Sequence, residues 1–235
     1  GWVDGKGGTD TLNYNGYGSL RHIALTGLGA LDGLDGSEAS LVGFKHINTL
    51  VGSSLTGDSL TGLDAVSIWA ISGSASGSCT STATLTFSQV EILNGSSDRD
   101  TLDFSSLASG RNVILTGVAA VGFSGSESVS GITFSGINAL IGSSATDSLT
   151  GANLTNTWEL DGSNRYITGA DSLDFSSFEQ LVGGTGDDLF EFTIAHTGSI
   201  DGGAGSDTLD YSTLGSSISI ILTSLGSSDG FAGTE

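Results

Sequence analysis

Two nine-residue segments combine closely spaced glycines with an aspartate, a combination that suits the binding of a hard cation. They are Gly183-Gly-Thr-Gly-Asp-Asp-Leu-Phe-Glu and Gly202-Gly-Ala-Gly-Ser-Asp-Thr-Leu-Asp. Glycines permit a tight turn and expose backbone carbonyls, and Asp188 and Asp207 each add a carboxylate. Oxygen ligands in a flexible turn are those that Ca²⁺ selects. These segments therefore predict calcium-binding turns.

Four further turns keep only part of this pattern. They are Gly5–Asp10, Gly52–Asp58, Gly95–Asp100 and Gly142–Asp147. Matching turns are mostly roughly 40–48 residues apart, so the sequence predicts no continuous calcium ladder. Asp10 and Asp100 are included as candidate calcium ligands. The alternative for all four turns is a structural role, in which the aspartate bonds its own backbone.

The two complete segments match the nonapeptide G-G-x-G-x-D-x-U-x and resemble the RTX, or haemolysin-type, calcium-binding repeat. The resemblance implies that each nonapeptide is a turn followed by a short strand, with Ca²⁺ between the turns of successive coils. It names as candidate ligating positions Asp188, Asp207, Gly184, Gly186, Gly203, Gly205, Asp10 and Asp100.

Longer stretches also look like the repeats of giant filamentous-haemagglutinin-like and RTX-type bacterial surface proteins. They are residues 156–164, 175–188 and 201–212. This resemblance implies a secreted or cell-surface protein that forms a fibre, sheath or adhesin. The partners it implies are adjacent repeat units of the same or identical chains, and host or cell-surface glycans.

The sequence does not favour an enzyme. Aspartate pairs such as Asp98 and Asp100 recur along the chain, whereas an acid–base dyad needs one fixed arrangement in a cleft. No Ser/His/Asp set or phosphate-binding loop is visible. The alternative function is a carbohydrate-binding or polysaccharide-modifying β-helix module. Trp69 and Trp158, 89 residues apart, are expected in the core, with a sugar-stacking platform as the alternative.

Composition excludes several classes of partner. The 235 residues include six Lys and Arg against 26 Asp and Glu, a formal net charge of −20. This charge argues against nucleic acid and anionic lipid, which both need basic surfaces. No apolar run approaches the ~18 residues that suggest a membrane-spanning helix. Cys79 is the single cysteine, so an internal disulfide is excluded, and the absence of Met predicts a piece of a longer chain.

Internal repeats indicate the architecture. Residues 1–38 align without gaps to residues 198–235, with identity at 19 of 38 positions, including Glu38 and Glu235. A shorter period of about 90 relates Asp10 to Asp100. The predicted repeats are approximately residues 4–93, 94–200 and, as a partial copy, 201–235, within one continuous segment spanning 1–235.

The third copy of the Asp-Thr-Leu motif is displaced by about 18 extra residues, essentially 183–200. A solenoid accepts one more coil easily, because each coil contacts only its neighbours. We therefore predict an all-β parallel β-solenoid, a β-helix or β-roll, with coils of roughly 17–24 residues. Tandem β-sandwich modules of about 90 residues are the alternative, and they accommodate the insertion poorly.

Short runs of alternating residues support strands with one buried face. The positions expected to point inward are Ala83, Leu85, Phe87, Phe190, Phe192, Ile194, Ile218, Ile220 and Leu222. Sustained helical spacing is absent from the sequence, which also favours an all-β fold.

Overall fold

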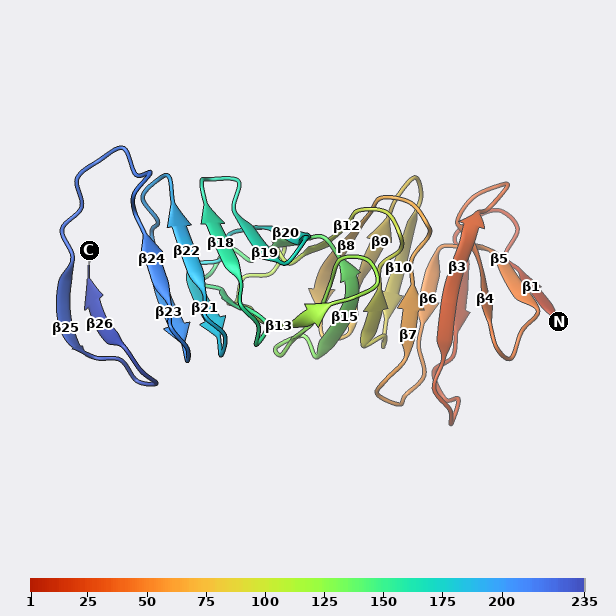
Figure 1. Ribbon diagram of the computed structural model, residues 1–235. Helices are drawn as coiled ribbons and strands as arrows, with labels where there is room; N and C mark the ends of the chain where they lie inside the picture. The colour runs from red at the N-terminus through yellow and green to blue at the C-terminus, as the bar shows by residue number, and fades with distance from the viewer. Residues whose placement is uncertain (235) are drawn as a thin grey trace.

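The structure is a computed structural model that describes residues 1–234, and every regular element in this range is a β-strand. Figure 1 shows an elongated molecule with the termini at opposite ends. The first of two twelve-stranded sheets contains, in spatial order, β1 (Trp2–Asp4), β5 (Gly43–Ile47), β4 (Leu34–Glu38), β3 (His22–Leu28), β7 (Ser59–Thr61), β11 (Ile92–Asn94), β15 (Ile132–Ile137), β14 (Phe123–Glu127), β13 (Asn112–Val118), β17 (Ser148–Thr150), β21 (Gln180–Gly184) and β23 (Ser199–Gly203).

The second twelve-stranded sheet lies opposite the first along the length of the molecule. It contains, in spatial order, β2 (Thr11–Asn13), β6 (Thr49–Val51), β10 (Thr84–Ser88), β9 (Ser76–Thr80), β8 (Ser67–Gly73), β12 (Asp100–Asp103), β16 (Ala139–Ile141), β20 (Asp171–Ser176), β19 (Arg165–Thr168), β18 (Thr157–Leu160), β22 (Leu189–Phe192) and β24 (Thr208–Asp210). A separate hairpin of β25 (Ile221–Leu225) and β26 (Phe231–Thr234) follows.

The chain passes alternately from one sheet to the other, and each coil stacks on the coil before it. This arrangement confirms the parallel β-solenoid. The inserted segment forms one such coil: Gln180 pairs with Ser199 in the first sheet, and Leu189 with Thr208 in the second, both in parallel and 19 residues apart. The alternative of tandem sandwiches is wrong. Glu235, which aligns with Glu38, lies outside the described residues.

Four three-stranded antiparallel meanders interrupt this winding, and the sequence patterns did not indicate them. They are β3–β4–β5, β8–β9–β10, β13–β14–β15 and β18–β19–β20. Because each meander adds two strands, most parallel neighbours are far apart in sequence, from 32 residues for Thr157 and Leu189 to 41 for Trp2 and Gly43. The predicted spacing of 17–24 residues occurs only in the last coil.

Apolar side chains from both sheets fill the space between them. Leu85, Phe87, Phe190 and Phe192 are buried as predicted. The indole ring of Trp158 stacks on Phe190 with centroids 5.4 Å apart. Trp158 and its counterpart in the earlier repeat are both fully buried, so they are core residues and not a sugar-stacking platform.

The inward orientation predicted near the C-terminus is wrong. Ile194 is exposed, and so are Ile218, Ile220 and Leu222. The last of these lies on β25, whose hairpin is hydrogen-bonded to neither large sheet. Within residues 1–234, β25 therefore has β26 as its one partner strand. Among the described residues, no helix is long and apolar enough to cross a membrane.

Candidate calcium site at the aspartate turns

The aspartate turns lie along the two edges of the solenoid. The turns with Asp10, Asp100, Asp188 and Asp207 each lead into a strand of the second sheet. Because those strands are parallel, these turns share one edge. The turns with Asp58 and Asp147 lead into the first sheet and lie along the opposite edge.

Each turn begins with a glycine because the aspartate carboxylate folds back over it. A Cβ atom added to Gly142 would lie 2.8 Å from Oδ2 of Asp147 and 1.8 Å from the carbonyl oxygen of Ser177 in the next coil. A Cβ added to Gly183 would lie 2.4 Å from Oδ2 of Asp188. Close packing of backbone and carboxylate therefore explains the spacing of these glycines and aspartates.

Asp147 shows what the carboxylate does in a typical turn. Its Oδ2 accepts the backbone N–H of Ser143 in its own turn at 2.7 Å, and its Oδ1 accepts that of Arg111 in the preceding coil at 2.5 Å. Its own N–H donates to Oε2 of Glu179 in the following coil at 2.9 Å. One buried aspartate thus links three successive levels of the solenoid.

The same arrangement recurs at Asp58, whose carboxylate accepts the backbone N–H groups of Arg21 and Ser53. Asp100 accepts that of Ser96 at 2.7 Å. In all three turns the aspartate therefore bonds the backbone of its own turn.

Asp100 and Asp10, both candidate calcium ligands, lie on separate coils. Asp100 is fully buried, and burial raises its pKa, while Ser96, Trp69 and Ser67 beside the carboxylate lower it. Oδ2 of Asp10 is buried without a hydrogen-bond partner. Neither residue hydrogen-bonds to the turns of Asp188 and Asp207 among the bonds the structure describes. The structure therefore does not unite the predicted ligands in one centre.

Asp188 and Asp207 do come together. The N–H of Asp188 donates to Oδ1 of Asp207 at 2.9 Å. Oδ1 of Asp188 accepts from the backbone and side-chain nitrogens of Asn156, whereas its Oδ2 is buried without a hydrogen bond. Burial raises the pKa of Asp188 to about 6, opposed by Asn156 and increased further by the charges of Asp207 and Asp187.

The four glycines predicted as ligating positions, Gly184, Gly186, Gly203 and Gly205, serve backbone geometry. Gly184, Gly203 and Gly205 have φ of 128°, 91° and 125°, a region that favours glycine. A Cβ on Gly186 would lie 2.1 Å from the carbonyl oxygen of Leu154. The carbonyl oxygen of Gly184 accepts the N–H of Ala204 at 3.0 Å.

Among the candidate aspartate ligands in the described residues, Asp188 and Asp207 are the two that lie in contact. Asp187, Asp188 and Asp207 concentrate negative charge there, and Oδ2 of Asp188 offers a buried oxygen without a donor. In the described residues, no group of three or more His, Cys, Asp or Glu side chains is placed to hold a metal. Backbone carbonyls of the glycine turns would therefore have to supply most of the ligands.

Two buried ion pairs were missed by sequence reasoning. Arg21 contacts Glu38 at 3.3 Å, and Arg111 contacts Glu127 at 3.6 Å, with all four side chains nearly inaccessible to solvent. The recurrence of both partners at an offset of about 90 is the signal that would have revealed them. Each pair joins the residue just before the first strand of a first-sheet meander to the second strand of that meander.

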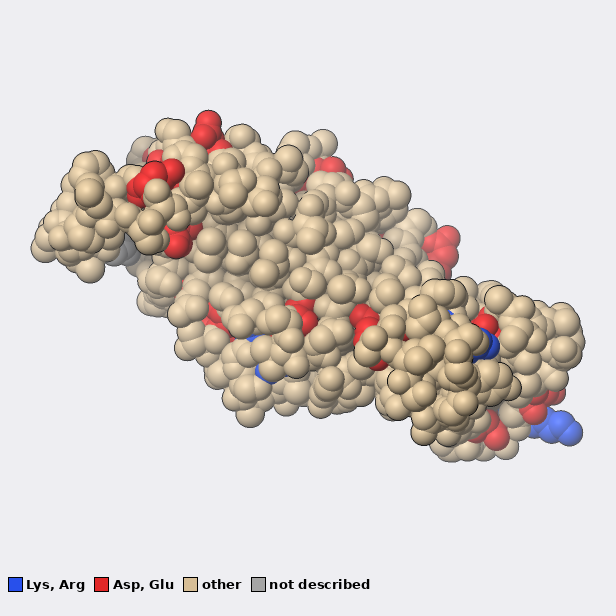
Figure 2. Space-filling model, turned by 90° about the horizontal axis from the view of Figure 1, so that it is seen from below, with Lys and Arg blue, Asp and Glu red and all other residues tan. Residues whose placement is uncertain are grey.

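Two depressions lie on the surface of the described residues. A depression of about 320 Å³ beside β13 and β17 has no ionisable side chain in its lining. A second depression, of about 290 Å³ near β16 and β20, has one carboxylate among its lining residues. This is Asp174, which pairs with Arg99. His46 pairs with Asp4 at 2.7 Å, apart from the aspartate turns of later coils. Figure 2 shows acidic side chains spread along the visible face, with few basic ones.

Comparison with models of known protein families, with curated proteins and with solved structures found no match for this chain.

Proposed function

We propose that this chain is a structural and adhesive repeat segment of a large extracellular fibre, sheath or adhesin, with calcium held at the corner of Asp188 and Asp207. The observation that supports this most is the continuous link from coil to coil. Each buried aspartate of the Asp147 type bonds the coil before it and the coil after it. Two sheets of twelve strands therefore form one stiff rod.

The charge of the chain agrees with this role. A net charge of −20 keeps a long rod soluble but opposes its compaction through self-repulsion. A divalent cation beside Asp188 would relieve the repulsion among Asp187, Asp188 and Asp207. Calcium is plentiful outside the cell, so the proposed site and the proposed location support each other.

Localisation tests the proposal directly. Antibodies raised against the folded chain should label intact cells that produce it, and immunoelectron microscopy should place the label on surface filaments or a sheath. Antibody preincubated with excess chain is the control and should give no label. Label that appears only after the cells are permeabilised would overturn an extracellular structural role.

A further inference from the structure

The two meanders of the second sheet differ in charge. Residues 65–90, which contain the β8–β9–β10 meander, include no Asp, Glu, Lys, Arg or His, and they form the longest such run in the sequence. The β18–β19–β20 meander, residues 157–176, contains five charged residues, namely Glu159, Asp161, Arg165, Asp171 and Asp174. In a chain with a net charge of −20, an uncharged meander needs a physical reason.

The outward side chains of the β8–β9–β10 meander are short and lie in rows. Burial alternates along each of the three strands, so every second side chain points away from the core. Those that point outward include Ile68, Ala70, Ser76, Ser78, Thr80, Thr84, Thr86 and Ser88. Because the strands are in register, Thr86, Ser78 and Ala70 form one row across the meander.

Two neighbouring strands extend these rows. Thr49 of β6 is the register partner of Thr86 on one side and of Thr11 of β2 on the other. The second outward side chains of these strands, Asn13 and Val51, are also uncharged. We call the outward side chains of β2, β6, β10, β9 and β8 the uncharged face.

Acidic side chains occupy the outward surface farther along the same sheet. Asp103 of β12, the register partner of Ala70, bears the first outward charge. In β18, β22 and β24, Glu159, Glu191 and Asp210 are register partners in one row. The outward surface of the second sheet is therefore divided into the uncharged face and an acidic part.

The chemistry of the uncharged face makes it inexpensive to cover. Oγ1 of Thr80 and Oγ1 of Thr84 lie 3.0 Å apart and share a hydrogen bond, which persists when water leaves. Ile68 is 48% exposed, so covering it removes apolar surface from water. Short and β-branched side chains also lose little rotamer freedom on burial.

We propose that the uncharged face binds the same face of a second copy of the chain, with the two rods antiparallel. Between chains of net charge −20, contacts through acidic surfaces are opposed by repulsion, whereas neither copy brings a charge to this face. The strands of both copies have the same spacing of about 4.8 Å, so the rows match strand after strand. This contact rests on the proposed function and supplies the lateral association that a fibre or sheath requires.

The antiparallel orientation follows from the charges of the sheet. A two-fold axis along β9 places Ser78 opposite Ser78 of the second copy, and Thr86 opposite Ala70 of the second copy. A longer side chain then faces a shorter one. Parallel rods would instead bring the acidic strands β18, β22 and β24 of the two copies together.

The size of the contact sets the expected strength. The seven strands from β2 to β16 in the sheet, about 4.8 Å apart and roughly 14 Å wide, cover about 500 Å² per copy, less than the about 800 Å² of a standard interface. Single segments should therefore associate only when concentrated, and several repeats engaged together should bind more tightly.

Sedimentation equilibrium over a range of concentrations tests the contact. The wild type should dimerise as its concentration rises, and Ser78→Asp should lower the association constant about tenfold or more, because two carboxylates then face each other. Ser172→Asp is the matched control: it adds the same charge to an outward position of β20 and should associate like the wild type. Urea unfolding checks that both variants are folded. Equal association of wild type and Ser78→Asp would overturn the proposal.

A charge exchange tests whether the same faces meet. Ser78→Lys alone should associate less than the wild type, but mixed with Ser78→Asp it should form a heterodimer at least as stable as the wild-type dimer, because opposite charges then face each other. A mixture that stays monomeric would show that Ser78 does not face its counterpart.

Disulfide cross-linking tests the orientation. The native Cys79 is 2% exposed, and burial raises the pKa of its thiol to about 12, so mild oxidation should report only introduced cysteines. A mixture of Thr86→Cys and Ala70→Cys chains should give the mixed disulfide. Disulfides only between two Thr86→Cys chains would overturn the antiparallel orientation.

The outcome is separate from that of the proposed function. A wild-type chain that stays monomeric at every concentration would overturn the lateral contact, and label on surface filaments would still support the structural role.

Discussion

The backbone N–H of Asp188 lies 2.9 Å from Oδ1 of Asp207, so the carboxylate of one coil holds the backbone of the coil before it. The same carboxylate folds over Gly202 of its own turn, where a Cβ would lie 2.3 Å from Oδ2. In the turns of Asp58 and Asp147 the aspartates hold the solenoid together in the same way. The acidic residues at these turns are therefore chiefly internal links of the fold.

Replacing a linking aspartate should destabilise the whole rod. Asp147→Ala removes a buried acceptor of two backbone N–H groups, those of Arg111 and Ser143. We expect the free energy of unfolding to fall by about 3–5 kcal/mol, since these donors are then left buried and unpaired. Urea unfolding followed by circular dichroism measures this. Asp174→Ala, at an exposed ion pair with Arg99, is the control and should lower the free energy of unfolding by at most about 1 kcal/mol. Equal losses of unfolding free energy in the two variants would contradict the linking role of Asp147.

The glycine that begins a turn should tolerate no side chain. Gly142→Ala places a Cβ 1.8 Å from the carbonyl oxygen of Ser177, so two coils must separate. We expect a loss of about 3 kcal/mol or more in the free energy of unfolding, by the same urea measurement. Gly215→Ala is the matched control, because a Cβ there meets nothing within 4 Å. A Gly142 variant as stable as the control would show that the coils do not pack as described.

Stability should depend on pH through Asp188. Burial raises the pKa of Asp188 from 3.8 to about 6, so the folded chain holds this proton more tightly than the unfolded chain. The stabilisation from this proton is fully present below about pH 4 and is lost as the pH rises through 6. The free energy of unfolding of Asp188→Asn, taken relative to that of the wild type, should therefore increase as the pH rises from 4 to 7 in EDTA.

Urea unfolding at intervals of one pH unit measures this difference. Asp98→Asn, which removes an exposed carboxylate, is the control for the loss of one charge. A constant difference for Asp188→Asn would contradict the raised pKa.

Calcium should stabilise the chain at one corner. At about 100 times its dissociation constant, Ca²⁺ bound only to the folded state raises the free energy of unfolding by about 2.7 kcal/mol. Hydrogen exchange should slow chiefly between residues 183 and 207. Asp207→Asn should lose most of this calcium effect, and Asp98→Asn should retain it. Identical melting curves in calcium and in EDTA would show that these turns are purely structural.

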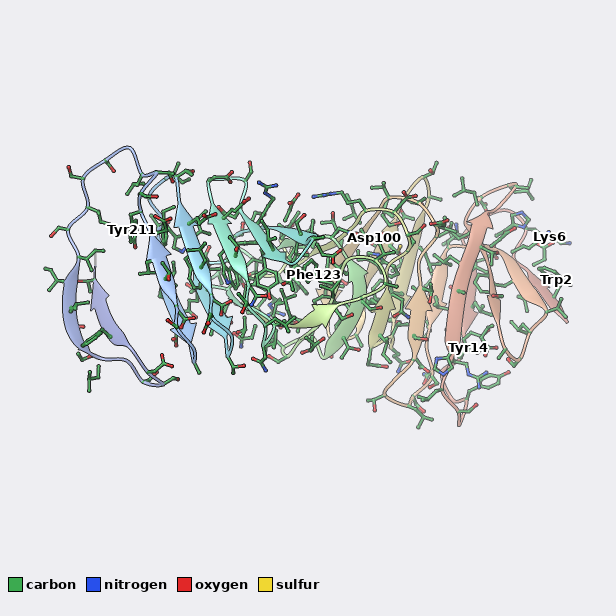
Figure 3. The ribbon with its side chains drawn as sticks, in the orientation of Figure 1. Trp2, Lys6, Tyr14, Asp100, Phe123 and Tyr211 are labelled. Atoms are coloured by element: carbon green, nitrogen blue, oxygen red, sulfur yellow. The ribbon has the colours of Figure 1, made fainter. Side chains whose placement is uncertain are left out.

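The recurring tryptophans should affect stability and not sugar binding. Trp158→Ala removes a fully buried ring that stacks on Phe190, so the free energy of unfolding should fall by about 3–5 kcal/mol. Trp2, at the N-terminal end in Figure 3, is 60% exposed. Trp2→Ala should therefore change the free energy of unfolding by about 0.5 kcal/mol or less. Thermal and urea unfolding compare the variants; a Trp158 variant that unfolds like the wild type would contradict the core assignment.

The sequence alone determined the fold class and the stacking of coils. The offset of 197 residues and the added segment of residues 183–200 indicate windings that lie on one another, because only a stacked rod lengthens by a single coil without rearrangement. The alternation at Phe190 and Phe192 is local, so it predicts a buried face directly. The pairing of Asp188 with Asp207 along one edge follows from their spacing of one coil.

Only the tertiary structure decided which strands run antiparallel and what the aspartates bind. Alternation looks the same in a parallel and an antiparallel strand, so Gly36 facing Phe44 could not be predicted from local spacing. A Gly-Asp turn suits either a cation or a backbone donor, and the choice at Asp147 depends on Arg111, 36 residues earlier in sequence and brought close by coil stacking. Long-range register determines those contacts, and no short motif records it.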